Sequence, residues 1–213
     1  YGTDPMGVTA ENIAEMTGIT RLEQDEFALA SHQRAVAAQD SGKFGEEILP
    51  VSVPQRKGDP VVVSQDERPR RDTSLEALSR LKPAFKPNGT VTAGNSSGLN
   101  DGAAAMLVMS AEKAHALGLK PMARFISSAA SGIEPRIMGL GPIEATRRAL
   151  ARAGLQIGDI SLAEINEAFA VQTLAVMREL GLSHTITNVN GGAVALGHPL
   201  GCSGTRILTT LLY

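Results

Sequence analysis

The alternation of apolar and polar positions predicts helices in the first forty residues. Thr9 can cap a helix that ends at Gly18, because glycine readily takes the left-handed backbone conformation that closes a helix. Leu22, Leu29 and Val36 then recur at helical spacing up to Gly42 and predict a second helix. The first part of the chain therefore begins with two helices.

Capping and proline signals divide the residues that follow. Thr20-Arg-Leu-Glu23 fits a capping box, in which a hydroxyl and a carboxylate satisfy unpaired N–H groups at a helix start. Residues 46–63 alternate in strand fashion around two prolines, which suits extended or edge segments. Residues 64–90 are polar and irregular, with one short helix predicted over 74–80. We expect this part to run over a surface instead of forming a sheet core.

The pattern changes near Asn95, after which short apolar runs alternate with helical ones. The small apolar run 102–109 suits a buried strand. Further strands are predicted over 122–131, 162–165 and 186–189, and helices over 110–117, 143–153, 168–180 and from 203 onward. This alternation predicts an α/β fold with mixed or parallel strand pairing.

Composition narrows the class of protein. With 213 residues the chain has room for one large or two modest domains, and its net charge of −2 gives no basic field for nucleic acid. The single cysteine excludes an internal disulfide and suggests a reducing compartment. No apolar run reaches membrane-spanning length and no signal peptide opens the chain. We expect a cytoplasmic protein, with mitochondria or peroxisomes left open because both ends look internal to a longer chain.

Two strings carry groups able to do chemistry. Gly197-His198-Pro199 places an imidazole on a glycine-rich loop that follows an apolar run, instead of on a helix face. Glu164-Ile-Asn166-Glu167-Ala-Phe-Ala170 places an amide and a carboxylate after a predicted strand. Loop residues on rigid scaffolds are enriched in function, so His198 and Asn166 are candidate catalytic residues.

The structural alternatives are specific. Asn166 and Glu167 can serve as a helix N-cap pair, and we expect Glu167 to be a buried acceptor and not an acid or base. We expect His32, His115 and His184 to be solvated, since they lie on or beside predicted helices. His198 and Cys202 do not make a metal site, because zinc needs three or four ligands.

Two further strings are Met6-Gly-Val-Thr-Ala-Glu-Asn12 and Gly89-Thr-Val-Thr-Ala-Gly-Asn-Ser-Ser-Gly-Leu-Asn-Asp-Gly102. Together with the strings around Asn166 and His198, they resemble the thiolase family, in the family's order and through essentially the whole chain. The resemblance implies a thiolase-like layered α/β/α/β/α fold, present in part. Residues 1–99 would form the CoA-binding loop domain, 100–121 the end of the N-terminal half, and 122–213 a truncated C-terminal half.

The resemblance implies an acyltransferase that cleaves or forms the C–C bond of a 3-oxoacyl-CoA by a ping-pong acyl-cysteine mechanism. His198 would activate the cysteine and donate to the developing oxyanion, which suits an unperturbed pKa of about 6.5. Asn166 would hold a water at the same oxyanion. Both family cysteines would lie outside this sequence, since Cys202 matches neither, so we expect the 213 residues alone to be inactive. No cofactor or metal is implied; CoA and acetyl-CoA are substrates.

Residues 68–86 carry an excess of Arg and Lys, and guanidinium groups pair well with phosphate. Alone, this segment would be taken for a solvated loop. The resemblance instead implies that several residues contact CoA or substrate, although Ala77 replaces a family serine. These residues are Arg70, Leu81, Phe85, Ala93, Ser97, Met6, Met138, Ala168 and Phe169.

The alternatives to this interpretation concern the substrate and the class of protein. Tyr1-Gly-Thr-Asp4, Arg70–Leu78 and Pro135–Gly139 resemble the 3-oxoadipyl-CoA branch of aromatic degradation, whereas Met6-Gly-Val-Thr9 departs from it. A condensing enzyme would carry a second histidine where Asn-Glu-Ala-Phe stands. A non-catalytic CoA or acyl-lipid binding module is the alternative of another class. β-Oxidation of fatty acids and a homodimer or homotetramer are also expected from the family, with no nucleic-acid or membrane partner.

Overall fold

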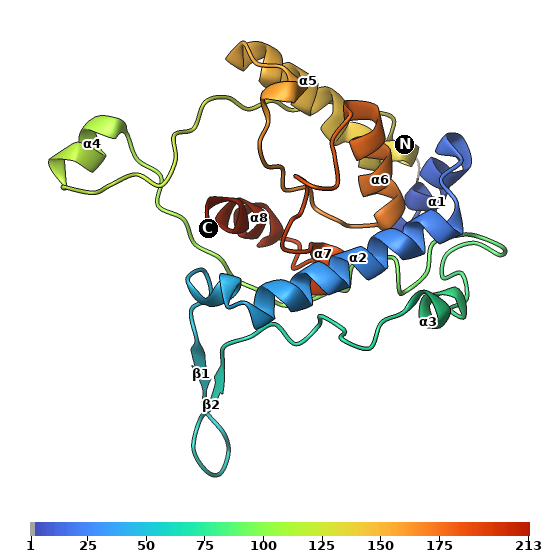
Figure 1. Ribbon diagram of the computed structural model, residues 1–213, viewed down its shortest axis with the longest axis horizontal. Coiled ribbons are helices and arrows are strands. Elements are labelled where there is room, and N and C mark those ends of the chain that lie inside the picture. The colour runs from blue at the N-terminus through green and yellow to red at the C-terminus, as the bar shows by residue number, and fades with distance from the viewer. Residues whose placement is uncertain (1–2) are drawn as a thin grey trace.

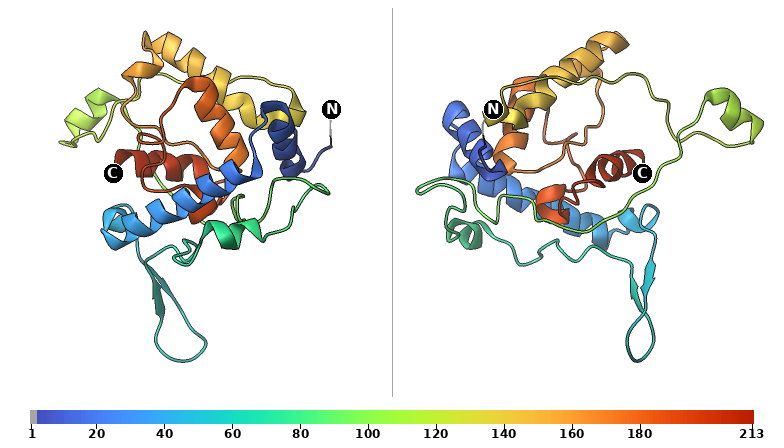
Figure 2. Two further views of the ribbon diagram at one scale, coloured as in Figure 1. Left: turned by 45° about the vertical axis from the view of Figure 1, so that its right-hand side comes forward. Right: turned by 180° about the vertical axis from the view of Figure 1, so that it is seen from behind.

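The computed structural model describes residues 3–213, and its longest helix, α2 (Arg21–Asp40), crosses the molecule (Figure 1). The views of Figure 2 show α7 (Ala193–Leu196) against α2 from other sides. The remaining helices are α1 (Met6–Thr17), η1 (Lys43–Gly45), α3 (Leu75–Ser79), α4 (Ala111–Ala116), η2 (Pro135–Leu140), α5 (Gly141–Ala153), η3 (Ile157–Asp159), α6 (Ala170–Leu180) and α8 (Ser203–Leu212). None of the helices between residues 3 and 213 has the length and apolar character needed to cross a bilayer.

Local signals place the helix ends well. Gly18, Gly154 and Gly181 follow α1, α5 and α6 in the left-handed conformation, as predicted. The capping box before α2 is confirmed, since Thr20 Oγ1 accepts from the Glu23 N–H and Glu23 Oε2 accepts from the Thr20 N–H. Helix α1 begins earlier than predicted, at Met6, and α6 begins later, at Ala170. The single turn α7 was not predicted.

The buried side of α2 carries polar residues beside apolar ones such as Phe27, and Leu22 of the predicted repeat is not among them. Leu22 is 58% exposed, whereas Gln24 and Asp25 are buried. The expectation that His32 is solvated was wrong, because its side chain is only 5% exposed. This helix packs on loops, and loop backbone groups need polar partners when they are buried.

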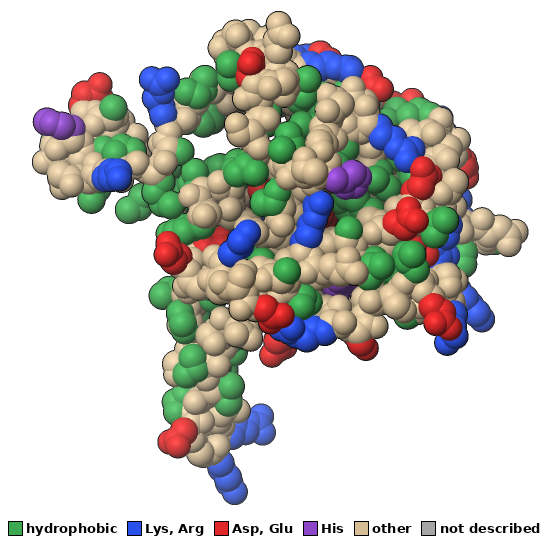
Figure 3. Space-filling view, in the orientation of Figure 1, with side chains coloured by type: hydrophobic (Ala, Val, Ile, Leu, Met, Phe, Trp, Pro, Cys, Tyr) green, Lys and Arg blue, Asp and Glu red, His purple; other side chains and the backbone are tan. Residues whose placement is uncertain are grey.

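Several predicted strands are absent as strands. The only ladder among the described residues is the antiparallel hairpin of β1 (Val51–Val53) and β2 (Val61–Val63), which projects from the body of the molecule (Figures 1 and 3). Segments 102–109 and 122–131 have no strand beside them in the described part of the chain. Segments 162–165 and 186–189 share a single parallel bridge. A strand forms only where a neighbour pairs its N–H and C=O groups, and these segments lack one here.

The main apolar core lies between α1, α2 and α6. Ile13 and Phe27 meet Val171 and Leu174 there, with η2 closing one side. Alanines fill much of the remaining contact surface, in keeping with a chain that is 3% aromatic. Close packing of small side chains brings the start of α6 near α1, and this juncture positions the candidate site.

Candidate active site

A glycine bend holds His198 between α7 and α8. Gly197 has φ +101°, and a Cβ built on it would lie 2.1 Å from Asn100 Oδ1, so only glycine fits. The His198 N–H donates to Gly98 O at 2.9 Å. The loop that carries the histidine is therefore fixed against the segment that contains Gly98 and Asn100.

The two strings predicted to act together do meet. Asn166 Nδ2 lies 3.3 Å from His198 Nε2, although the residues are 32 positions apart. Asn166 Oδ1 is buried and has no hydrogen-bond partner within the described chain. Polar atoms without partners are uncommon in folded proteins and mark sites where another group can bind.

Ser203 contacts the other side of the imidazole ring. His198 Nδ1 lies 2.6 Å from Ser203 Oγ, which in turn donates to Pro199 O at 3.1 Å. A hydroxyl that donates to this carbonyl leaves its oxygen to accept from Nδ1–H. We infer from this that the neutral ring carries its proton on Nδ1 and a lone pair on Nε2, toward Asn166.

The surroundings favour a neutral His198. Burial lowers the pKa of His198 below its ordinary value, and the positive charge of Arg206 on α8 lowers it further. A neutral imidazole with an available Nε2 lone pair can accept a proton near neutral pH. Sequence reasoning missed Ser203; a hydroxyl five residues after the histidine, at a helix start, is the signal that could have found it.

Glu167 joins the two loops, and its prediction as a buried acceptor is confirmed. It is 1% exposed; Oε2 accepts from Ser31 Oγ at 2.7 Å and from the Val194 N–H at 3.1 Å, and Oε1 accepts from Asn188 Nδ2 at 2.8 Å. A Cβ on Gly192 would lie 2.2 Å from its carboxyl carbon. Burial raises the pKa of Glu167.

Asn188 fixes the segment before Asn166. Its φ is +47°, and its side chain forms two bonds with Ile165: Oδ1 accepts from the backbone N–H at 2.8 Å and Nδ2 donates to the carbonyl at 2.9 Å. Asparagine tolerates this left-handed conformation better than most residues do. The amide of Asn166 is therefore held one residue beyond a fixed backbone segment.

A cavity of about 240 Å³ opens beside the Asn166–His198 pair. Six of the residues predicted from sequence line it together, and most of the wall is apolar, as in many small-molecule sites. These six are Met6, Met138, Asn166, Ala168, Phe169 and His198.

Other predicted residues extend from this cavity. Phe85 meets Phe169 edge to face, with ring centroids 6.0 Å apart. Ser97 Oγ donates to Ala168 O at 3.0 Å. Leu81 is 38% exposed and precedes Phe85 in the chain. Arg70 and Ala93 are exposed and lie outside the cavity wall.

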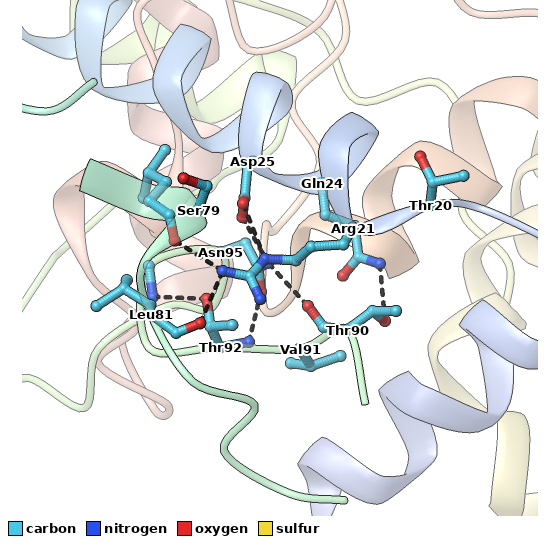
Figure 4. A network of polar contacts seen from close by, with 12 residues as sticks. Thr20, Arg21, Gln24, Asp25, Ser79, Leu81, Thr90, Val91, Thr92 and Asn95 are labelled. Carbon is cyan, nitrogen blue, oxygen red and sulfur yellow. Dashed lines mark hydrogen bonds and ion pairs between the residues drawn. The ribbon is translucent and has the colours of Figure 1, made fainter. Parts of the chain in front are cut away.

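A buried polar network on α2 holds the segment that carries these residues (Figure 4). Arg21 Nη2 donates to Leu78 O at 2.7 Å and to Leu81 O at 3.0 Å. Asp25 accepts from Arg21 Nε at 2.8 Å and from Asn95 Nδ2 at 2.9 Å. Sequence reasoning missed this network, although Arg21 and Asp25 have the i,i+4 spacing of a helical ion pair.

A second polar group lies behind the site. Burial raises the pKa of Glu164 to about 7, against the opposing effect of Arg206, whose Nη1 lies 4.0 Å from Glu164 Oε2. Within residues 3–213, no three histidine, cysteine or acidic side chains gather closely enough to hold a metal ion. Cys202 is half-buried in the loop after His198.

Comparisons with known proteins decide the family. Residues 1–112 match the family model described as thiolase, N-terminal domain, and residues 119–213 match the model described as thiolase, C-terminal domain. The chain belongs to the thiolase family. The three-part division at residues 99 and 121 stays a prediction.

Curated relatives of this thiolase-family chain are similar over nearly all of its length. An acetyl-CoA acetyltransferase of Pseudomonas aeruginosa is 60% identical over 98% of the chain and 53% of the relative. A probable acetyl-CoA acyltransferase of Staphylococcus epidermidis is 57% identical over the same shares. The chain thus spans about half the length of the curated relatives it matches.

Solved structures confirm the predicted fold class. The Bacillus anthracis acetyl-CoA acetyltransferase has a TM-score of 0.96 at 50% identity, covering 98% of this chain and 53% of that one. The human mitochondrial 3-ketoacyl-CoA thiolase has a TM-score of 0.90 at 46% identity, covering 98% and 52%. This thiolase-family chain therefore carries the thiolase fold in part.

Proposed function

We propose that this chain supplies the histidine and amide of a thiolase active site, which cleaves or forms the C–C bond of a 3-oxoacyl-CoA. The observation that carries the proposal is the 3.3 Å approach of Asn166 Nδ2 to His198 Nε2 at the wall of an apolar cavity. A thioester needs an apolar channel for its acyl and pantetheine parts and a few polar groups where charge develops.

The proposed chemistry uses the lone pair of His198 Nε2. The imidazole takes the proton of a cysteine thiol, and the thiolate attacks the keto carbon of the substrate. The C–C bond then breaks, its electron pair forms the enolate of acetyl-CoA, and this enolate collects a proton. The thiol of free CoA finally accepts the acyl group, and the cysteine is restored.

Asn166 contributes at the oxygen that becomes negative. Its Nδ2 can donate to a water or directly to the oxyanion once substrate separates it from His198. An amide donates without carrying charge. The unpartnered Asn166 Oδ1 supports a bound water there, because water can donate to it.

Substrate class follows from CoA recognition and from the names of relatives. The relatives named acetyl-CoA acetyltransferase and the structure named 3-ketoacyl-CoA thiolase support short or medium 3-oxoacyl-CoA substrates. The 3-oxoadipyl-CoA branch of aromatic degradation is the alternative, supported by the segments Arg70–Leu78 and Pro135–Gly139. The part of that resemblance carried by Tyr1 and Gly2 lies outside the described residues. β-Oxidation, a cytoplasmic location and a homodimer or homotetramer remain predictions from the family.

A matched pair of histidine variants in the full-length protein tests the proposal. His198→Ala should lower kcat for acetoacetyl-CoA thiolysis by several orders of magnitude while leaving CoA binding intact, because the base is gone. His115→Ala, on the exposed side of α4, should keep normal turnover. Normal turnover by His198→Ala would overturn the assignment.

The alternative class is a CoA or acyl-lipid binding module without catalysis. The observation in its favour is that the only cysteine, Cys202, is not the family nucleophile by position. A full-length wild-type protein that binds CoA but turns over none of a series of 3-oxoacyl-CoA substrates would support this module.

A further inference from the structure

One histidine outside the cavity is buried in a way that the proposed chemistry does not use. His32 lies in the middle of α2 and is 5% exposed. Its Nδ1 accepts a hydrogen bond from the backbone N–H of Arg70 at 3.0 Å. The two residues are 38 positions apart, so this bond fixes the segment around Arg70 against the helix.

The residues on either side of Arg70 are also fixed. Arg71 forms two hydrogen bonds with Asp40 at the end of α2, at 2.8 and 2.6 Å. The guanidinium of Arg68 packs over Gly98, where an added Cβ would lie 2.3 Å from Arg68 Cζ. This segment therefore contacts the rest of the chain three times, through the backbone of Arg70 and through the side chains of Arg68 and Arg71.

Arg70 differs from Arg71 in having no ion pair, although both side chains are exposed. Among the described residues no carboxylate lies within 4.0 Å of its guanidinium, whereas Arg71 is paired with Asp40. A guanidinium on a fixed backbone and without an ion pair is prepared to bind a phosphate with two parallel hydrogen bonds.

We infer that His32 is a positioning residue for CoA binding: by accepting the Arg70 N–H, it holds the Arg70 guanidinium where it meets a phosphate of CoA. The inference rests on the proposed function, which makes CoA the ligand of this segment. Pre-organisation of this kind improves affinity because less freedom is lost on binding.

The state of the ring is consistent with this role. Burial, which is the largest influence, and the positive charges of Arg70 and Arg68 together lower the pKa of His32 to about 4, against the opposing effect of Asp72. The ring is therefore neutral at neutral pH, and Nδ1 keeps the lone pair that accepts the N–H.

Two substitutions separate the acceptor from the bulk of the ring. His32→Asn keeps an acceptor, since Asn Oδ1 occupies nearly the position of His Nδ1, and should leave the Kd for CoA within about twofold. His32→Leu removes the acceptor and leaves the Arg70 N–H without a partner, so the Kd should rise about five- to tenfold. Calorimetric titration of the full-length protein with CoA measures both. The KM for CoA should follow the Kd, with kcat unchanged.

A double-mutant cycle and a helix control complete the experiment. In an Arg70→Ala background, His32→Leu should have no further effect on the Kd, because its effect passes through Arg70. Ala37→Gly weakens the same helix on its exposed side and should leave the Kd unchanged.

Each outcome bears on one claim. If Arg70→Ala weakens CoA binding but His32→Leu does not, or if His32→Leu and Ala37→Gly weaken it equally, the positioning role of His32 is wrong. If Arg70→Ala leaves the Kd unchanged, the placing of CoA phosphate at this segment is wrong, and His32 loses its role with it. Normal turnover by His198→Ala would instead count against the proposed catalytic residues and would leave the test of His32 by CoA affinity unaffected.

Discussion

Ser203→Ala tests the assignment of the imidazole protons. Within the part of the chain that the structure describes, Ser203 Oγ is the one partner of His198 Nδ1, at 2.6 Å, and Ser203 is 4% exposed. An unsatisfied N–H at a buried site costs about 1–3 kcal/mol, and the ring is then free to turn or to place its proton on Nε2. Because this free-energy cost destabilises the ring orientation needed for catalysis, kcat should fall about ten- to hundredfold, while the KM for CoA stays unchanged.

The dependence of kcat on pH shows in which direction Ser203→Ala moves the pKa of His198. The Ser203 oxygen accepts from Nδ1–H and stabilises the imidazolium more than the neutral ring, so its loss should lower the pKa of His198 further. The acid limb of the kcat profile for acetoacetyl-CoA thiolysis should move to lower pH. Nitrogen-15 NMR of the His198 ring should show protonation of Nδ1 in the wild type and a mixture of tautomers in the variant.

Thr210→Ala is the matched control, since it removes a buried hydroxyl of the same helix that donates to Glu47 instead. It should lose stability without moving the pH profile or the ring signals. A Ser203→Ala enzyme with the wild-type profile and wild-type ring signals would refute the assigned tautomer.

Two further predictions address the amide and the buried acid. Asn166→Ala should slow C–C cleavage about a hundred- to thousandfold and acyl exchange with CoA much less; partial-reaction assays that find equal losses would remove its oxyanion role. The pKa of Glu164 is raised from 4.5 to about 7, so the folded state holds more protons than the unfolded one between these values, and stability falls as pH rises through this window. In urea unfolding between pH 5 and 8, the free energy of unfolding of Glu164→Gln should fall with rising pH by on the order of 3 kcal/mol less than that of the wild type. An unchanged pH dependence would show that the pKa of Glu164 is not raised.

Helix ends were predictable because a few adjacent residues determine them. The capping box at Thr20 and the left-handed glycines at 18, 154 and 181 act within one helical turn. Strands depend on partners that the sequence does not place. The run 102–109 has strand composition, yet no neighbour pairs with it in the described chain, and Leu107 is 86% exposed.

The candidate site was predictable where a motif carried it and not where packing made it. Gly197-His198-Pro199 and Asn166 were found from their loops, and the structure brings them within 3.3 Å. Ser203 and His32 were not found, because each acts through a contact that depends on the folded path of the chain. Leu22 was misleading in the apolar repeat of α2, since it is 58% exposed while the helix buries polar groups such as Gln24.

Two buried polar residues of α2 connect the two parts of the proposed site. Ser31 and His32 are adjacent; Ser31 bonds to Glu167 of the proposed catalytic loop, and His32 bonds to the backbone of Arg70. One turn of helix thus fixes both the proposed catalytic loops and the proposed CoA-binding segment. Because buried polar groups are costly unless they are paired, a change in either loop that breaks its bond leaves an unsatisfied group on α2. We therefore expect substitutions at these two positions to have different effects. Ser31→Ala should lower kcat, and His32→Leu should weaken CoA binding.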